Sequence, residues 1–226
     1  MLDLMLNAQR RWRLHRLPPG PLRTYCSEPP PKPQLNYRDV PYIALDCETT
    51  GLHPTKDRIV SLGWVLLDGA RINLGTAAHR LVCLEHDMPA TSAVIHGITD
   101  DQVAAGEPLD QVLATLLPLM AGRVLIAHHA RIELGFIKAA CRRLYGRAPW
   151  IRTVDTMALA KRQLERKQTV VKPGALRLYT LSKHYNLPRL GAHHALSDAL
   201  LTAELFLAQA AYQETRRGLT LGDLMC

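Results

Sequence analysis

Two carboxylates stand two residues apart at the end of an apolar run. Asp46 and Glu48 follow the apolar residues 42–45 and precede Thr-Thr-Gly51-Leu52. This pattern predicts a buried β-strand and its exit turn, with both carboxylates on one face. Adjacent like charges repel, and a hard divalent cation such as Mg²⁺ or Mn²⁺ would hold them together. Alone, such a pair is more often two solvated acids, so other residues must decide.

Three further ionisable residues lie at the ends of predicted helices. Glu133 lies one turn into a helix that follows a short apolar strand. His193 and Asp198 flank the start of a long helix rich in Ala and Leu. Five residues turn an ideal helix by about 500°, which leaves the two side chains about 140° apart around the helix axis. They face one pocket only if His193 lies in the preceding loop. Gly191 and Ala192 favour such a loop.

Size and composition set broad limits on the function. The 226 residues, 47% of them apolar, can form one packed domain and a tail. A net charge of +8 favours a polyanionic partner such as nucleic acid, although a solvated basic surface explains it equally well. The five scattered cysteines argue against a disulfide framework or a zinc cluster and indicate a reducing, cytoplasmic compartment. No apolar run approaches the roughly 20 residues of a membrane span.

Residues 1–41 differ from the rest because they are basic and rich in proline. We predict a short basic helix over Met1–Leu17, which would contact nucleic acid, lipid or a partner, or would only dock on the core. The prolines predict an extended segment that acts as a linker or as a strap lying on the domain. Residues 216–226 form a tail for which the sequence predicts nothing.

The rest of the chain predicts an α/β fold. Three strands in meander order are expected at 42–47, at 59–67 and within 71–84, followed by a capping box from Thr99 to Gln102. A helix at 109–120 is followed by a strand at 123–127 and by a helix that begins at 131. A strand at 150–154 is followed by three helices: one that ends at about 166, one at 176–185 and one that ends at about 215. A meander followed by such alternation implies a mixed sheet.

This ordered set resembles the DnaQ-like exonuclease superfamily, in its DEDDh branch of 3′→5′ exonucleases. Residues 46–52 match its first motif, D-x-E-T-T-G-L, and residues 193–199 match its last, H-x-A-L-x-D-A. Residues 95–99, Ile-His-Gly-Ile-Thr, match a segment that usually follows the first motif. The likeness covers roughly residues 41–213. It implies a ribonuclease H-like domain over 42–215, with a mixed five-stranded sheet flanked by helices.

The resemblance also implies a site with two Mg²⁺ or Mn²⁺ ions. Asp46 would bridge them, Glu48 and Asp198 would complete the site of the attacking water, and Glu133 would support the second ion through water. His193 would be the general base, since an unperturbed pKa of about 6.5 suits proton removal near neutral pH.

The second family motif departs from its usual form. Residues 128–133 read His-His-Ala-Arg-Ile-Glu where the family shows H-N-A-x-F-D, so Glu133 replaces Asp and His129 replaces Asn. A longer carboxylate can still reach a metal through water, and we expect a working site. The alternative is a weakened or lost second metal site. His128, His129 and His194 are expected to be structural, and Asp155 is most simply a helix cap.

Contacts with the substrate follow from the same resemblance. The backbone of Thr49 and Thr50 and the side chain of Leu52 would seat the terminal nucleotide. His96 would lie near that nucleotide, although a turn histidine is an equal alternative. Basic side chains could guide the phosphates without reading sequence: Lys138, Arg142, Arg143, Lys161, Arg162, Arg166, Lys167 and Lys172.

The leading hypothesis is a metal-dependent 3′→5′ exonuclease that releases nucleoside 5′-monophosphates from single-stranded or frayed DNA ends. The preference for DNA rests on the resemblance to polymerase proofreading subunits. Two alternatives stay open. One is an RNA 3′-end-trimming enzyme of the same fold. The other is a weakly active module that holds nucleic-acid ends or a polymerase, with residues 1–41 as the contact to a protein partner.

Overall fold

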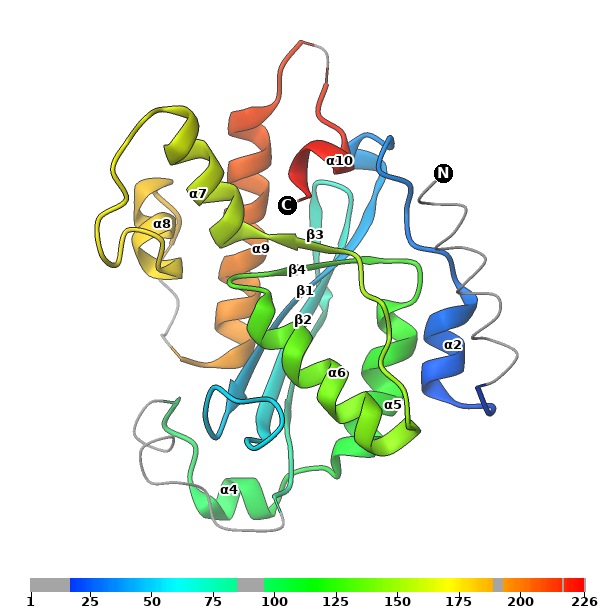
Figure 1. The fold of residues 1–226 in the computed structure, drawn as a ribbon. Coiled ribbons are helices and arrows are strands. Elements are labelled where there is room, and N and C mark those ends of the chain that lie inside the picture. The colour runs from blue at the N-terminus through cyan, green and yellow to red at the C-terminus, as the bar shows by residue number, and fades with distance from the viewer. Residues whose placement is uncertain (1–16, 85–95, 189–192, 217, 226) are drawn as a thin grey trace.

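The computed structural model describes residues 17–84, 96–188, 193–216 and 218–225 (Figure 1). Five strands form one sheet in the order β3-β2-β1-β4-β5. β1 and β2 pair antiparallel, as do β2 and β3, whereas β4 is parallel to β1 and β5 to β4. This arrangement confirms the predicted mixed sheet. The strands are β1 (Pro41–Thr49), β2 (Ile59–Asp68), β3 (Arg71–Leu81), β4 (Val124–Ala127) and β5 (Thr153–Asp155).

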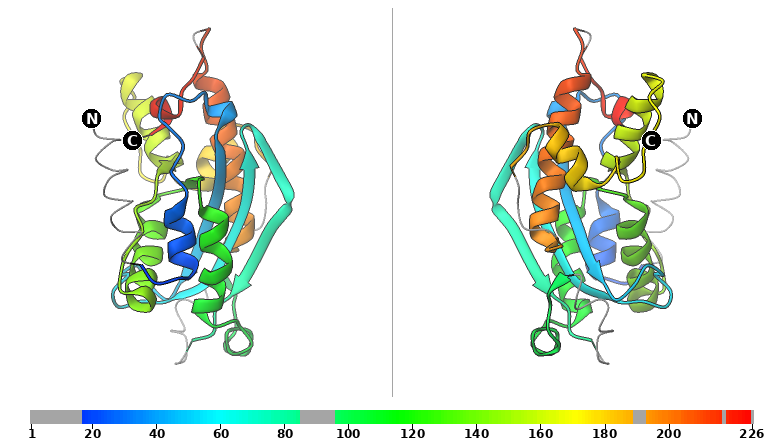
Figure 2. Two further views of the ribbon diagram at one scale, coloured as in Figure 1. Left: turned by 90° about the vertical axis from the view of Figure 1, so that its right-hand side faces the viewer. Right: turned by 90° about the vertical axis from the view of Figure 1, so that its left-hand side faces the viewer.

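Helices cover both faces of this sheet, while β2 and β3 form a bent ribbon at its margin (Figure 2). On β1, Ile43 and Leu45 pack with α2, α5 and α6, and the alternate residues Tyr42 and Ala44 pack with α7, α9 and α10. The helices are α2 (Pro21–Ser27), α4 (Asp100–Ala104), α5 (Leu109–Met120), α6 (Arg131–Tyr145), α7 (Thr156–Arg166), α8 (Leu178–His184), α9 (Ala195–Gln213) and α10 (Leu221–Leu224), with a 3₁₀ turn at Tyr37–Asp39.

Residues 17–40 lie on the domain, and we call them the strap. The prediction of an extended conformation was wrong for Pro21–Ser27. These residues form α2, with proline at its first position, where the missing N–H costs no helical hydrogen bond. Leu22 and Tyr25, three residues apart, are buried against the core beside α5. The predicted basic helix over residues 1–17 lies almost wholly outside the described residues.

The fifth strand was predicted at Trp150–Val154 and is observed at Thr153–Asp155. The Tyr25 hydroxyl donates to the carbonyl of Trp150 at 2.7 Å, and Arg152 donates to the carbonyl of Pro31 at 2.7 Å. Residues 150–152 therefore contact the strap, and β5 begins after them. Within the described ranges, no helix is both long enough and apolar enough to cross a bilayer.

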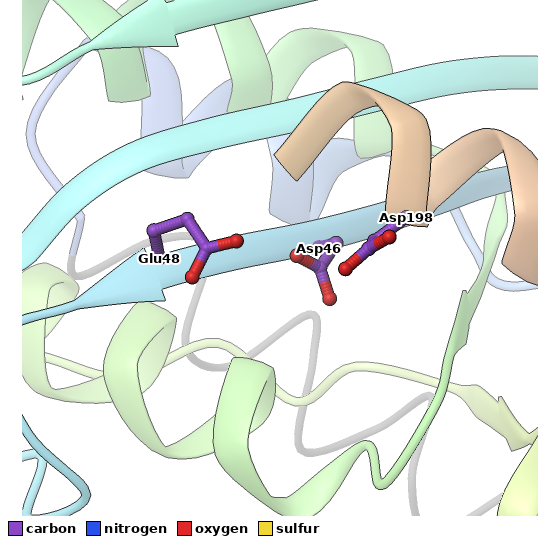
Figure 3. Close-up of side chains that lie close together, drawn as sticks. All are labelled: Asp46, Glu48 and Asp198. Atoms are coloured by element: carbon purple, nitrogen blue, oxygen red, sulfur yellow. The ribbon is translucent and has the colours of Figure 1, made fainter. Parts of the chain in front are cut away.

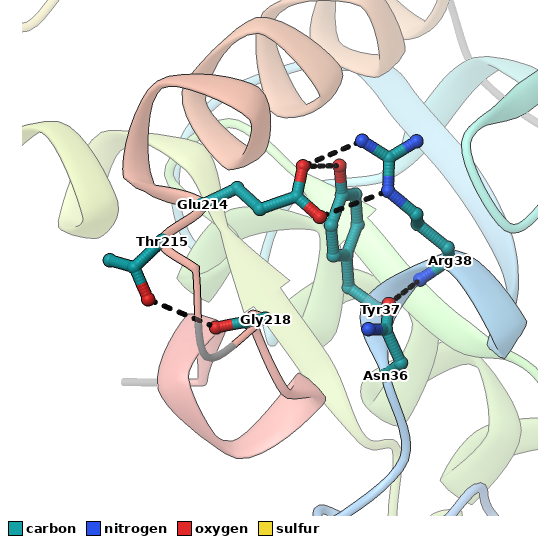
Figure 4. Close-up of polar contacts among 6 residues, drawn as sticks. All are labelled: Asn36, Tyr37, Arg38, Glu214, Thr215 and Gly218. Atoms are coloured by element: carbon teal, nitrogen blue, oxygen red, sulfur yellow. Dashed lines mark hydrogen bonds and ion pairs between the residues drawn. The ribbon is translucent and has the colours of Figure 1, made fainter.

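The residues just before β1 meet the residue that follows α9. Arg38 binds Glu214 through Nε–Oε1 at 3.1 Å and Nη2–Oε2 at 2.6 Å, and the Tyr37 hydroxyl lies 3.4 Å from the same carboxylate (Figure 4). We call these three residues the terminal clasp. Nearby, α10 buries Leu221 and Leu224 in the core, so the C-terminal tail is part of the domain.

Candidate active site

Asp46 and Glu48 extend from the face of β1 that α9 covers. They continue the alternation of Tyr42 and Ala44, whereas Cys47 lies in the core on the other face. The ladder between β1 and β2 is regular up to Glu48 and shifts register at Thr49, where β1 ends. The predicted pair of carboxylates on one side of a strand end is therefore observed.

Asp198 reaches this pair because the first turn of α9 lies directly on β2. A Cβ at Gly63, which pairs with Asp46, would lie 2.2 Å from the backbone of Ala195. Only glycine allows this approach. One carboxylate oxygen from each of Asp46, Glu48 and Asp198 lies within 4.8 Å of the others (Figure 3). We call these three residues the acid cluster.

Burial raises the pKa of every carboxylate in the acid cluster. Desolvation raises the pKa of Asp46 well above its usual range, and Glu133, Glu48 and Asp198 raise it further. Desolvation, then Asp198, raises the pKa of Glu48 to about 7. Desolvation also raises the pKa of Asp198, although its hydrogen bond from Tyr179 and the nearby His193 oppose this. Three desolvated carboxylates with raised pKa values form an oxygen-rich site that can bind a metal cation.

Glu133 lies in the first turn of α6 and is only 3% exposed. Burial raises its pKa to about 8, its own backbone N–H opposes the shift, and Asp155 and Glu48 add to it. Among the described residues, its Oε2 atom has no hydrogen-bond partner. Glu133 affects Asp46 electrostatically but does not belong to the set of oxygens within 4.8 Å. This position fits the expectation that Glu133 supports the second ion through water. That role stays a prediction.

His193 lies in the loop before α9, as the sequence required. Its backbone has φ of 58°, and α9 begins at Ala195. Its charge and its backbone N–H both lower the pKa of Asp198, which places the residue beside the acid cluster. His194 instead accepts a hydrogen bond from the backbone of Ser197 as the N-cap of α9, in agreement with its predicted structural role.

Tyr179 on α8 is a functional candidate that the sequence did not indicate. Its hydroxyl donates to Oδ1 of Asp198, and its ring centroid lies 6.5 Å from that of His193. A tyrosine in a helix gives no signal for such a contact, because aromatic residues at helical spacing usually belong to the core. The structure adds Tyr179 to the residues that surround the acid cluster.

Asp155 has a second structural role besides the predicted cap. Its carboxylate accepts from the backbone N–H of Met157 and Ala158 at the start of α7. It also accepts from His129 at 3.1 Å and Ala130 at 3.0 Å, at the turn into α6. Asp155 therefore fixes the turn that carries Glu133.

The residues predicted to contact the substrate, Thr49, Thr50, Leu52 and His96, all lie within the described ranges. Leu52 is 71% exposed, while the Thr49 hydroxyl donates to the carbonyl of Gly51. His96 is partly buried, and its pKa is lowered by desolvation first and by His193 as well, whereas the Thr49 backbone raises it. These contacts place His96 near both Thr49 and His193. The role of these residues in binding a nucleotide stays a prediction.

Comparisons with known proteins agree with this geometry. The family model described as Exonuclease (RNase_T) matches residues 43–206. The DNA polymerase III PolC-type protein of Thermotoga maritima is 31% identical over 175 residues, which are 76% of this chain and 12% of that protein. The DNA polymerase III subunit epsilon of Treponema pallidum is 28% identical over 186 residues, covering 80% of this chain and 82% of that protein. The chain thus spans only about an eighth of the PolC-type relative.

Solved structures show the same fold. E. coli exonuclease I, in a zinc-bound complex with single-stranded DNA, gives a TM-score of 0.67 at 18% identity, over 77% of this chain and 41% of that one. Exonuclease X, in complex with 5′-overhanging duplex DNA, gives a TM-score of 0.58 at 24% identity, over 79% of this chain and 97% of that one. These neighbours confirm the predicted ribonuclease H-like architecture.

Proposed function

The chain belongs to the exonuclease family, within the DnaQ-like superfamily, and from this premise we propose that it is a metal-dependent 3′→5′ exonuclease. One observation carries the proposal: a carboxylate oxygen of Asp198, on α9, lies within 4.8 Å of oxygens of Asp46 and Glu48, about 150 residues earlier in the chain. Solvated acids would stay apart, whereas these three lie together, desolvated and with raised pKa values.

The donor set suits Mg²⁺ or Mn²⁺, which prefer carboxylate oxygens. Asp46, Glu48 and Asp198 would hold the ions, and the buried, unpartnered Oε2 of Glu133 supports a contribution from that residue through water. When bound, two such ions neutralise the charge that develops on the phosphoryl group and activate water. Glu133 and Glu48, with pKa values of about 8 and 7, would lose protons as the metal binds.

The remaining residues orient groups and move a proton. His193 would accept the proton of the attacking water, because its loop position beside Asp198 leaves its side chain exposed to a substrate. Tyr179 would hold Asp198 in one orientation by donating to Oδ1, so that the carboxylate stays directed at the rest of the cluster. Leu52 and His96 would seat the terminal nucleotide beside them.

We favour single-stranded or frayed DNA as the substrate, and nucleoside 5′-monophosphates as products. The support is indirect: one structural neighbour holds single-stranded DNA, and one relative is a polymerase subunit. A polymerase or other protein partner bound through residues 1–41, and a cytoplasmic location, stay predictions from the sequence.

The test compares matched DNA and RNA strands with free or chemically blocked 3′ ends. With Mg²⁺ or Mn²⁺ we expect mononucleotides from free 3′ ends only, faster from DNA, and none with a chelator. Faster release from RNA would select the RNA-trimming alternative. Internal cuts or release from the 5′ end would refute the proposal. Tight binding of the strand without products would select the non-catalytic module.

A further inference from the structure

A groove runs between the C-terminal half of α6 and the loop that joins β1 to β2. It consists of two adjoining hollows of about 630 and 370 Å³, which share Asp57, Arg58, Ile59, Leu109 and Arg143. The larger hollow also reaches Thr50, which directly follows β1. This α6 groove therefore begins at the end of the sheet where the acid cluster lies.

The lining of the α6 groove combines apolar walls with a cationic rim. Ile59, Phe136 and Ala140 are buried core residues that line the groove. The rim carries four exposed basic side chains against two carboxylates, one of which, Asp57, already accepts from the backbone N–H of His53. The basic residues are Lys56, Arg58, Arg142 and Arg143, and the second carboxylate is Asp110. Apolar walls below a cationic rim suit a nucleic-acid strand.

The charges on the rim are available to a ligand. Lys56, Arg142 and Arg143 make no side-chain hydrogen bond or ion pair with any residue in the described ranges, and Arg58 donates only to carbonyls of its own loop. Three other basic residues predicted to guide phosphates are already engaged. Arg162 donates to the carbonyls of Met225 and Asp223, Lys161 pairs with Glu165 at 3.8 Å, and Lys167 contacts Tyr212.

We propose that the α6 groove binds the phosphodiester backbone of the substrate strand, a few nucleotides 5′ of the end that is cut. This inference rests on the proposed function. From Glu133 to Arg142, α6 rises by about 14 Å, which is longer than one nucleotide. The β1–β2 loop lies directly on α6 between these points, since a Cβ at Gly135 would be 2.7 Å from Pro54. A strand that leaves the acid cluster across this loop enters the groove.

The experiment compares Arg142→Ala/Arg143→Ala with a control that removes two exposed charges elsewhere, Arg71→Ala/Lys32→Ala. Arg71 lies at the opposite end of β2, and Lys32 lies in the strap. The probes are a labelled single-stranded DNA of about 16 nucleotides and the p-nitrophenyl ester of thymidine 5′-monophosphate, which is too short to reach the groove. Affinity for the strand is measured across a salt series, and ester hydrolysis is measured with Mn²⁺.

For the groove variant we expect a Kd for the long strand about tenfold higher and a salt dependence shallower by about 1.4, because each phosphate contact on a single strand contributes about 0.7 to the slope. Ester hydrolysis should match the parent, and the control should bind like the parent. Lys56→Gln, from the opposite wall, should weaken strand binding in the same direction and guards against a folding defect in the double variant.

Two results would overturn the inference: unchanged binding and salt slope in the groove variants, or an equal loss in the control. Failure of the proposed function is a separate result. If the parent hydrolyses neither ester nor strand, but the groove variants still lose affinity for DNA and the control does not, the groove stands as a nucleic-acid site and the nuclease assignment fails.

Discussion

The two ends of β1 carry acids in opposite electrostatic environments. At the start of the strand, the terminal clasp places Glu214 against Arg38, whose hydrogen bond is the largest cause of the lowered pKa of Glu214. At the other end, Asp46 lies among further carboxylates, and desolvation followed by like charge raises its pKa. In the folded protein, the clasp therefore favours the ionised form of its acid, whereas the acid cluster favours the protonated form.

This contrast separates acids that stabilise the fold from acids that would bind a ligand. An acid whose charge is compensated by the protein contributes to stability directly. A group of desolvated acids lowers stability when, as here, the protein compensates only one of them, Asp198, through Tyr179 and His193. Such a group persists because the surrounding core fixes it in place. The comparison predicts that substitutions at the acid cluster change activity and stability in opposite directions, while those at the clasp change stability alone.

Asp46→Asn should produce the largest effect. The amide keeps the shape but cannot supply the anionic ligand, so turnover should fall by roughly a thousandfold or more. Without metal, the variant should be more stable than the parent, since one desolvated charge is gone. Nucleotide release and urea unfolding measure the two effects. Asp68→Asn, in the exposed β2–β3 turn, is the control; a less stable Asp46→Asn would contradict the comparison.

His193→Ala should lower turnover by about 10²–10⁴-fold, the usual contribution of a general base. Metal binding and DNA binding should stay close to those of the parent, because we assign His193 to proton transfer. Calorimetric titration with Mn²⁺ and strand-binding assays make the distinction. His184→Ala, at the end of α8, should behave like the parent. Lost metal affinity in His193→Ala would make the residue a ligand or a structural element.

Tyr179→Phe tests whether the hydroxyl on Asp198 prepares the cluster for metal. The ring stays and the hydrogen bond to Oδ1 is lost, so the Mn²⁺ affinity should fall by about 10- to 100-fold. Tyr185→Phe removes a hydroxyl that donates to Gln163 at 2.9 Å and should leave Mn²⁺ binding unchanged. Equal Mn²⁺ isotherms for Tyr179→Phe and the parent would remove Tyr179 from the site.

The stability of the metal-free protein should fall as pH rises, because burial raises the pKa values of Glu48 and Glu133. Glu48 and Glu133 have pKa values of about 7 and 8 in the folded protein, above their usual values. The folded state therefore binds more protons than the unfolded state between about pH 4.5 and pH 8, and metal-free stability falls as pH rises through this window. Urea unfolding at successive pH values measures this slope. Mg²⁺ at a concentration a hundred times its Kd should raise the free energy of unfolding by about 2.7 kcal/mol. A rise in metal-free stability across the window would contradict the raised pKa values.

Local sequence patterns predicted much of this molecule. The bounds of α5 followed from its apolar periodicity, and the resemblance of the motifs around Asp46, Glu48 and Asp198 to the DnaQ-like superfamily predicted that these acids converge. Gly63 carried an unused signal, because a glycine inside a strand often marks a close approach of another backbone.

Features that depend on distant partners could not be predicted in the same way. β5 begins later than expected, and Tyr25 and Pro31 of the strap contact Trp150 and Arg152 just before it. The contact between Tyr179 and Asp198 joins two helices through side chains alone. The helix in the strap depends on burying Leu22 against the core, which outweighed the extended preference of the surrounding prolines.

Arg38→Ala should have the smallest effect and the opposite pH dependence. The Arg38 and Glu214 side chains are 51% and 27% exposed, so solvent screens the pair and the urea midpoint should fall only slightly at neutral pH. Because the folded pKa of Glu214 lies below its usual value, this contribution is present above about pH 4.5 and is lost as pH falls below it. High salt should also reduce it. Turnover should match the parent, since the clasp lies at the far end of β1 from the acid cluster. A clear loss of turnover with an intact fold would show that the two ends of the strand are coupled, and the separation of stabilising and ligand-binding acids would fail.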